Sequence, residues 1–282
     1  MSGPLVISFI EEMDYLRSAW REAGDTVALV PTMGSLHEGH LALVKEASNG
    51  ADHVVVSIFV NPLQFGPTED FATYPRQLAV DQDFLTDTEV EVIFAPSVEG
   101  VYPHGSDSHP MLRAGKVGEL FEGASRQGHF DGVVTVVKRL FDIVQPDSAV
   151  FGKKDAQQLF LIHQMVQGEK VPVALFEVDT VRSADGVALS SRNAYLSESE
   201  RELSTAIPRA LRAATQAPTI ADALDAARGV LETTEGISVD YLEVVDPQTF
   251  QVTRDSNPAL MIVAVVVGST RLIDNQVLTF HQ

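Results

Sequence analysis

The sequence predicts an α/β protein in which a parallel-sheet domain is followed by a smaller α+β domain. Up to about residue 180, apolar strand-like segments alternate with segments of helical spacing, which is typical of a parallel sheet covered by helices. After residue 180, two helical segments precede three strand-like segments, and this order indicates an α+β unit. We therefore expect one domain at residues 1–180 and a second at residues 181–282.

In the first domain the residue pattern alternates regularly. We expect strands at residues 26–30, 53–60, 90–94, 148–151 and 173–178, and helices at residues 39–48, 77–88, 132–145 and 155–166. Segment 132–145 contains VVTVV, which favours a strand, but its apolar residues recur at helical spacing and its length favours a helix. In the second domain we expect helices at residues 198–215 and 219–234, and strands at residues 238–245, 259–268 and 270–274.

Composition limits the classes of protein. The 282 residues are 45% hydrophobic and include no cysteine, which excludes disulfides and thiolate metal sites. The net charge is −19, and the residues beyond 191 contain no lysine and more acidic residues than arginines. Because nucleic-acid-binding proteins normally present a basic face, we do not expect a nucleic-acid partner.

The apolar segments are too short for a membrane span. The longest, residues 259–268, is about half the necessary length. The first residues, MSGPLVISFIEEMDYL, lack the basic leader of a signal peptide. We therefore expect a cytoplasmic protein with no membrane partner.

The stretch PTMGSLHEGH, residues 31–40, follows the first expected strand and leads into a helix. Parallel sheets bind ligands beyond the carboxyl ends of their strands, and a helix N-terminus offers N–H donors to phosphate. Gly34 permits a close backbone approach, and Gly39 lets the turn tighten. His37 and His40 add donors that can bind a developing negative charge or deliver a proton. This stretch therefore predicts a phosphate-binding turn.

Other interpretations of the stretch differ in how well they fit. It contains neither G-x-x-x-x-G-K-[ST] nor G-x-G-x-x-G, and its histidines are too close together for H-E-x-x-H. Two interpretations remain open from the residues alone. The histidines could bind zinc with further ligands from elsewhere, or they could simply cap the helix.

H-x-G-H after a first strand resembles the signature of the nucleotidylyltransferase superfamily, and PTMGSLHEGH resembles the pantothenate synthetase (pantoate–β-alanine ligase) family. Further segments resemble that family in order along the chain: NPLQFG at 61–66, YPR at 74–76, EG at 122–123, Arg126 with GHF at 128–130, FGKKDAQQ at 151–158, TVR at 180–182, SSRN at 190–193, and then YLEVVDP and GSTRLIDN. The resemblance covers essentially the whole chain and implies a Rossmann-like first domain.

Two positions depart from the family pattern. Gln127 stands where the family usually has proline, and Ser183 stands where it often has an acid. Either change can alter a loop, but neither removes a residue that we assign to chemistry.

The resemblance implies a ligase that forms a C–N bond in two steps. The carboxylate of (R)-pantoate attacks the α-phosphate of ATP and gives pantoyl adenylate and diphosphate. The amine of β-alanine then attacks the activated carbonyl and releases AMP and pantothenate. Because the substrates supply both nucleophiles, the protein is expected to position the reactants and stabilise charge.

The resemblance also implies the site residues. The expected catalytic residues are His40 as proton donor, His37, Lys154 and Arg192. The expected ATP-binding residues are Met33, Gly34, Ser35, Leu36, His37, Glu38, Gly39, His40, Gly152, Lys153, Lys154, Asp155, Val181, Leu189, Ser190, Ser191 and Arg192. Gln64 and Gln158 are expected to bind pantoate, and Gln64 also β-alanine. An adenylyl-lysine at Lys154 is disfavoured, because the residues after it do not match K-x-D-G.

ATP is expected to react as its Mg²⁺ complex, in which Mg²⁺ often keeps water ligands. We can name no protein ligand for the metal; Asp81 and Asp83 are candidates by residue type only. The resemblance further implies a homodimer and closure of the second domain over the ATP site.

Two alternative functions stay open at this point. One is another nucleotidylyltransferase, such as a cytidylyltransferase or an aminoacyl-tRNA synthetase core, which the acidic C-terminal part and the FGKKDAQQ and SSRN segments disfavour. The other is a nucleotide-binding regulatory protein without turnover, which the presence of His37, His40, Lys154 and Arg192 together disfavours. Production of AMP distinguishes an active enzyme from the regulatory protein.

Overall fold

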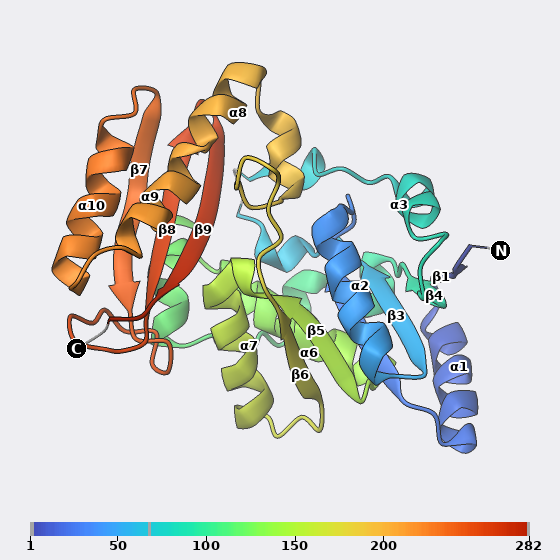
Figure 1. The fold of residues 1–282 in the computed structure, drawn as a ribbon. Helices are drawn as coiled ribbons and strands as arrows, with labels where there is room; N and C mark the ends of the chain where they lie inside the picture. The colour runs from blue at the N-terminus through green and yellow to red at the C-terminus, as the bar shows by residue number, and fades with distance from the viewer. Residues whose placement is uncertain (1–2, 67–68, 281–282) are drawn as a thin grey trace. The chain divides into compact units, whose positions relative to one another are not determined.

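The chain divides into two compact units in the computed structural model, which describes residues 3–66 and 69–280 (Figure 1). The first unit comprises Met1–Lys153 and Gln157–Asp179, and the second comprises Lys154–Ala156 and Thr180–Gln282. The short segment Lys154–Ala156 therefore groups with the C-terminal part of the chain, although it directly follows the first unit's Lys153.

The first unit contains a six-stranded sheet whose strands all run parallel, in the order β1-β4-β3-β2-β5-β6. The strands are β1 (Leu5–Ile7), β2 (Val27–Thr32), β3 (His53–Ile58), β4 (Val92–Phe94), β5 (Ser148–Gly152) and β6 (Ala174–Val178). Four consecutive residues of β2, Val27 to Val30, are buried, as expected of a strand with both faces covered. The predicted Rossmann-like parallel sheet is confirmed.

Helices connect these strands. They are α1 (Ile10–Ala23), α2 (Glu38–Gly50), α3 (Leu78–Phe84), α4 (Val98–Val101), α5 (Glu122–Ser125), α6 (His129–Val144) and α7 (Ala156–Gly168). Val44 and Ala47 of α2 pack against Ala28 and Val30 of β2, so α2 covers one face of the sheet. Two 3-10 turns bear on the site, η1 (Pro62–Gln64) and η5 (Lys153–Asp155).

The strand order places the start of α2 where the order of strands in the sheet reverses. β2 has β3 on one side and β5 on the other, so the chain builds the sheet outward in opposite directions from β2. Ligands of open parallel sheets bind beyond the carboxyl ends of the strands where the order reverses in this way. The turn from β2 into α2, which contains His37, therefore lies where a ligand is expected.

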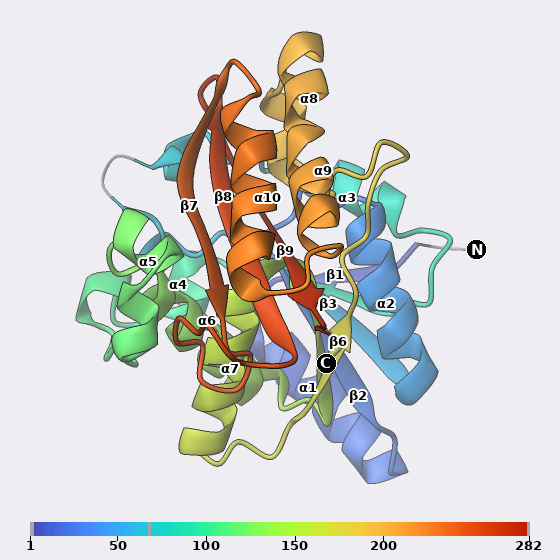
Figure 2. The same cartoon turned by 60° about the vertical axis from the view of Figure 1, so that its left-hand side comes forward.

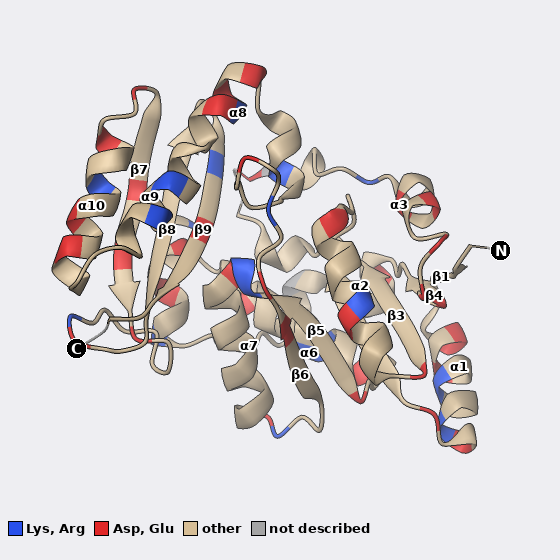
Figure 3. Cartoon of the chain, in the orientation of Figure 1, with Lys and Arg blue, Asp and Glu red and all other residues tan. Residues whose placement is uncertain are grey.

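The second unit contains an antiparallel sheet, β7 (Ile237–Val245), β8 (Ala259–Val267) and β9 (Thr270–Leu278), in that order. Its helices are α8 (Glu198–Ser204), α9 (Ala206–Ala214) and α10 (Ile220–Glu232), and η6 (Ser191–Tyr195) is a 3-10 turn. Figure 2 shows α9 and α10 over one face of this sheet, where their buried residues share one apolar core with it. Acidic residues lie along α8 and α10 (Figure 3). The predicted α+β character of this part is confirmed.

Three features differ from the sequence prediction. The single helix predicted at residues 198–215 is two helices, because the ring of Pro208 interferes with a helical bond to the carbonyl four residues earlier, at Ser204. The last strand extends beyond residue 274 to Leu278. Strand β1 and helix α1 were not predicted at all.

The ambiguous segment 132–145 is helical, as preferred. Among the described residues, no helix is both long enough and apolar enough to cross a membrane.

His53, at the start of β3, links the loops at the amino ends of the strands. Its Nε2 lies 3.1 Å from Asp25, its Nδ1 donates to Glu91, and its ring stacks on Trp20 with centroids 4.4 Å apart. Burial by itself would lower the pKa of His53, but the bonds to Glu91 and Asp25 outweigh it, and the pKa is raised. The protonated ring therefore stabilises this end of the sheet.

We predict that this contribution depends on pH. Because the folded pKa of His53 lies above the unfolded value of 6.5, the stabilisation is complete below pH 6.5 and is lost as the pH rises through the folded pKa. His53→Gln should lower the melting temperature at pH 6 by about 2–4 °C, as a loss of about 1 kcal/mol does in a chain of this size, and by less at pH 9. An equal loss at both values would contradict the prediction.

Candidate active site

A buried carboxylate holds the turn between β2 and α2. Gly34 and Ser35 have positive φ angles of 81° and 54°, which is uncommon for a residue that carries a side chain, such as Ser35. Asp81 of α3 is 2% exposed. It accepts the N–H of Ser35 at 3.0 Å and that of Leu36 at 2.8 Å. Since a buried charge needs such donors, Asp81 and the turn stabilise each other.

His37 and His40 cap the first turn of α2 reciprocally. The Gly39 N–H donates to Nδ1 of His37 at 3.1 Å, and the His37 N–H donates to Nδ1 of His40, also at 3.1 Å. A ring nitrogen that accepts a hydrogen bond carries no proton, so each neutral ring carries its proton on Nε2. The two ring centroids lie 4.2 Å apart. The site thus contains two adjacent Nε2–H donors, the form that can bind phosphate oxygens.

The backbone amides of the turn have acceptors within the protein. Gly34 donates to Thr32 Oγ1 at 3.1 Å, and His40 donates to the His37 carbonyl at 2.7 Å. The amides of four further residues have the acceptors described above: Ser35, Leu36, His37 and Gly39. Each backbone N–H from residue 34 to residue 37 therefore has an acceptor within the protein. These amides therefore already have acceptors in the structure, and the contacts of residues 33–40 with ATP stay a prediction.

A buried amide network orients Gln64 of η1. The Asn61 Nδ2 donates to Gln64 Oε1 at 3.2 Å and to the Gly132 carbonyl at 3.1 Å. The Tyr102 hydroxyl donates to Asn61 Oδ1 at 2.9 Å, and burial raises the pKa of Tyr102 so that it stays protonated. The Gln64 Nε2 donates to Met33 Sδ at 2.9 Å. Asn61 therefore fixes which end of the Gln64 amide donates, a role that the sequence analysis missed.

An ion pair supports the backbone of the same turn. The His129 Nδ1 donates to the Gln64 carbonyl at 2.8 Å, and Arg126 donates to His129 Nε2 at 3.0 Å. Arg126 also makes two bonds to Glu69, at 2.8 and 2.7 Å, and these bonds lower the pKa of the Glu69 carboxyl. Gln127 is exposed, so its departure from the family's proline leaves these contacts in place.

The two adjacent glutamines of α7 have different surroundings. Gln157 is buried; its Oε1 accepts the Glu122 N–H at 3.2 Å, and its Nε2 donates to the carbonyls of Val117 and Leu120 at 2.7 and 2.8 Å. Gln158 is only partly buried. Gln157 therefore holds the loop before α6, and Gln158 is the one suited to meet a substrate.

The first unit also contains a pocket of about 280 Å³ at the carboxyl ends of β3 and β4. Met33, Phe59 and Val98 contribute apolar surface to its lining, and Asp81 contributes a carboxylate. The pocket is therefore lined by Met33 of the turn that leads to the histidines, and by Asp81, which binds that turn.

In the second unit, two turns carry the predicted phosphate-binding residues. Lys154 and Asp155 lie in η5, with Nζ and Oδ1 3.7 Å apart. Ser190 caps η6, where its Oγ accepts the Arg192 N–H at 3.3 Å, and Ser191 is the first residue of that turn.

The remaining predicted residues flank these turns. The Leu189 N–H donates to the Val181 carbonyl at 2.9 Å, which closes the hairpin before η6. In the first unit, Gly152 ends β5, and the neighbouring Lys153 donates to Asp179 at 2.7 Å. That hydrogen bond raises the pKa of Lys153, so its charge is directed at Asp179.

The described residues contain no group of three or more histidine and acidic side chains that could hold a metal ion. Both oxygens of Asp81 accept backbone N–H groups, and Asp83 is exposed. The residues present therefore do not fit a metal held mainly by protein ligands.

The family model described as Pantoate-beta-alanine ligase matches residues 5–277. The chain belongs to the pantoate–β-alanine ligase family. It is therefore an ATP-dependent ligase that joins pantoate to β-alanine.

Individual relatives are similar over nearly their whole length. A pantothenate synthetase from Shewanella halifaxensis is 48% identical over 93% of this chain and 94% of its own, and one from Leifsonia xyli subsp. xyli is 51% identical over 90% and 89%. The crystal structure of pantothenate synthetase from Thermus thermophilus has a TM-score of 0.90, with 44% identity over 98% of this chain and 99% of that chain. A Francisella tularensis pantoate–β-alanine ligase complexed with an ATP compound and β-alanine has a TM-score of 0.82, with 32% identity over 97% of each chain.

We predict that the close approach of α6 to η1 requires glycine at position 132. A Cβ there would lie 2.1 Å from the Leu63 carbonyl oxygen and 2.7 Å from the Gln64 nitrogen. Gly132→Ala should cost about 1–3 kcal/mol by overpacking and should raise KM for pantoate, because it displaces the Gln64 turn. Chemical denaturation and steady-state kinetics test both effects.

The matched control is Gly229→Ala in α10, where an added Cβ would meet nothing within 4 Å. It should stabilise the protein by up to about 1 kcal/mol, the helix preference of alanine over glycine. A Gly132→Ala variant as stable and active as this control would contradict the packing argument.

Proposed function

We propose that the ligase works through a pantoyl-adenylate intermediate. The pantoate carboxylate attacks the α-phosphate of ATP, the bond from that phosphorus to the bridging oxygen breaks, and diphosphate leaves. The β-alanine amine then attacks the acyl carbon, the bond to the AMP oxygen breaks, and the amine proton is lost to solvent. The observation that carries this proposal is the pair of histidine caps at the switch point of the sheet, in which Nδ1 of His37 and Nδ1 of His40 each accept a backbone N–H.

In this proposal each side chain acts on charge. His40 and His37 donate to phosphate oxygens as negative charge develops on diphosphate. Lys154 supplies a point charge and Arg192 a guanidinium to the phosphates, while Ser190 and Ser191 offer hydroxyl donors. The Asn61 network supports the proposal, because it fixes the orientation of the Gln64 amide. In the proposal this amide binds the hydroxyls and carboxylate of pantoate and also contacts β-alanine.

We further propose that Mg²⁺ enters with ATP as its phosphate complex, since this metal keeps water ligands readily. It would offset phosphate charge, and the protein side chains named above would bind the remaining oxygens. We also propose a cytoplasmic homodimer, as the family resemblance implies, and sedimentation of the purified chain tests the dimer.

The direct test of function follows AMP release from Mg-ATP with (R)-pantoate alone, β-alanine alone, and both together. We expect steady AMP release only with both substrates, and exchange of labelled diphosphate into ATP with pantoate alone. Exchange with other acids but not pantoate would overturn the substrate, and no exchange with any acid would favour the regulatory alternative.

We predict that His40→Ala and Lys154→Ala each reduce the exchange rate by at least about 10²-fold, as loss of a charge-stabilising donor does elsewhere. Matched controls are His163→Ala, which removes a surface pair with Glu177, and Lys138→Ala, which removes a surface pair with Asp142. Both controls should exchange at the wild-type rate. Near-normal exchange in His40→Ala and Lys154→Ala would refute the assigned roles.

A further inference from the structure

The carboxylate of Asp274 on β9 is buried in the second unit. It is the centre of a network of hydrogen bonds. Its side chain is only 1% exposed. Arg182 donates to both of its oxygens, at 2.6 and 3.0 Å, in a two-point pair. A buried carboxylate requires such partners, and removal of one partner is strongly unfavourable. The Arg182–Asp274 pair is therefore a fixed point in this unit.

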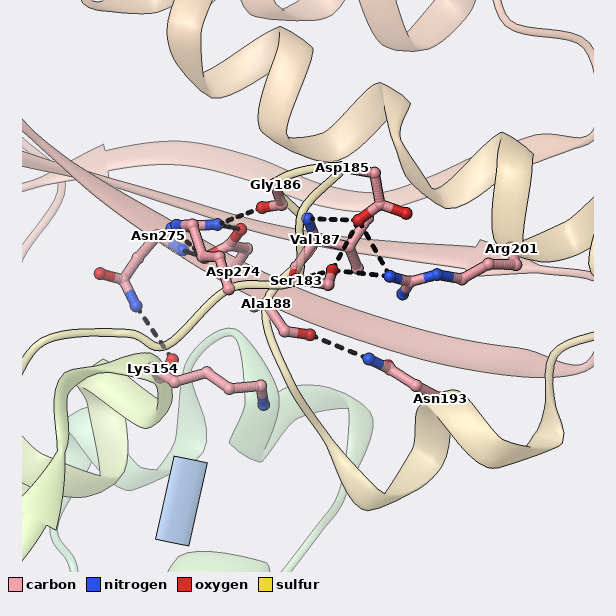
Figure 4. Close-up of polar contacts among 11 residues, drawn as sticks. Lys154, Ser183, Asp185, Gly186, Val187, Ala188, Asn193, Arg201, Asp274 and Asn275 are labelled. Atoms are coloured by element: carbon pink, nitrogen blue, oxygen red, sulfur yellow. Dashed lines mark hydrogen bonds and ion pairs between the residues drawn. The ribbon is translucent and has the colours of Figure 1, made fainter. Parts of the chain in front are cut away.

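One branch of this hydrogen-bond network connects the Arg182–Asp274 pair to η5. The Asn275 N–H donates to Asp274 Oδ1 at 2.8 Å, and the Asn275 Nδ2 donates to the Lys154 carbonyl at 2.9 Å. Figure 4 shows the Asn275 side chain directed at that carbonyl, with the Lys154 side chain extending from the same turn. These partners are 121 residues apart in the chain, so this bond ties a distant segment to β9.

The other branch of the hydrogen-bond network connects the pair to η6. Arg182 donates to the Gly186 carbonyl at 3.1 Å, and residues Arg182 and Ala188 pair across a short antiparallel bridge. The Asn193 Nδ2 then donates to the Ala188 carbonyl at 3.0 Å, which links η6 to the hairpin (Figure 4). The turn that carries Ser191 and Arg192 is thus connected to the same ion pair.

Ser183, which departs from the family's acid, keeps the hairpin closed in another way. Its hydroxyl accepts from Arg201 at 2.6 Å and bonds to Asp185, which also accepts from Arg201 at 2.9 Å. Asp185 therefore supplies the negative charge beside Arg201. The serine at position 183 leaves the branch of hydrogen bonds toward η6 intact.

We propose that Asn275 is a positioning residue for Lys154, and that the Arg182–Asp274 pair holds Asn275 and the η6 turn on one scaffold. This inference deepens the proposed function, because it rests on Lys154 binding the phosphates of ATP. In this proposal Asn275 acts through Lys154 and not on a reacting atom. It fixes the backbone from which the Lys154 ammonium extends, and a displacement of about 1 Å in such a group can cost about 10²-fold in rate.

The experiment is a double-mutant cycle on diphosphate exchange with pantoate. Asn275→Ala should lower kcat for exchange by about 10-fold, within the range found when a supporting hydrogen bond is removed, with KM for pantoate unchanged. Asn275→Asp keeps the shape but replaces the donor by an oxygen that faces the Lys154 carbonyl, so it should lose at least as much. In Lys154→Ala, the further change Asn275→Ala should have no effect, because nothing remains to be positioned.

Gln276→Ala is the matched control, since Gln276 is the next residue of β9 and its Nε2 donates only locally, to Val277 at 3.1 Å. It should retain the wild-type rate. Circular dichroism and thermal unfolding confirm that each variant is folded before its rate is compared, and Asn275→Asp provides the comparison if Asn275→Ala does not fold.

The outcomes separate the two proposals. Wild-type exchange in folded Asn275→Ala or Asn275→Asp, beside impaired Lys154→Ala, would overturn the positioning role alone. Losses that multiply in the double variant would also overturn it, because they would show that Asn275 acts independently of Lys154. Wild-type exchange in Lys154→Ala would overturn the role of Lys154 in the proposed function and the inference with it.

Discussion

The geometry of the histidine turn depends on the contact between Asp81 and the amides of Ser35 and Leu36. A non-glycine residue at φ 54° next to a glycine at φ 81° is an unfavourable backbone that needs support. The carboxylate of Asp81 supplies that support from another helix, and the two N–H groups in return satisfy a charge that is almost completely buried. Removal of either side would leave the other uncompensated.

With the turn held in this way, the first residues of α2 can use their own side chains as caps. The bonds to Nδ1 of His37 and His40 satisfy helix amides and fix the tautomer of both rings at once. Structural capping by these rings is therefore compatible with the phosphate binding that we propose. The helix uses one nitrogen of each ring, and the other nitrogen carries the proton that a phosphate oxygen requires.

The same separation of roles recurs elsewhere in the chain. Gln64 is a proposed substrate contact, and Asn61 sets its orientation. Gln157 is a buried structural amide, and its neighbour Gln158 is the proposed contact. Lys154 is a proposed phosphate contact, and Asn275 binds its carbonyl. In each case an amide side chain is hydrogen-bonded within the protein beside a proposed contact, and such support is how precise geometry is maintained.

The sequence was informative where the physical cause is local. The apolar period of β2, β3 and β5 and the helical spacing of α6 depend on nearby residues, so the parallel sheet was predictable. Helix α1 was missed because its buried residues, Met13 and Trp20, are sparse on a polar surface. The break between α8 and α9 did have a local signal in Pro208, which the prediction did not use.

The residues of the site were likewise predictable only where the signal is local in the sequence. Family motifs led to His37, His40, Lys154 and Arg192, because each lies in a short segment whose residue types resemble the family. The role of Asp81 has no local signal, because its partners are 46 and 45 residues away. A sequence pattern could present it only as a metal candidate by residue type. Asn275 is comparable, since only the fold brings it to Lys154.

We infer that His37 and His40 carry their protons on Nε2, because the amides of Gly39 and His37 donate to Nδ1 of the two rings. Long-range proton–nitrogen NMR correlation of the imidazole rings in the full-length protein distinguishes this tautomer from the other. We expect a protonated Nε2 and an unprotonated, hydrogen-bonded Nδ1 in both rings at a pH where they are neutral. A proton on Nδ1 of either ring would contradict the reciprocal cap and the donor role derived from it.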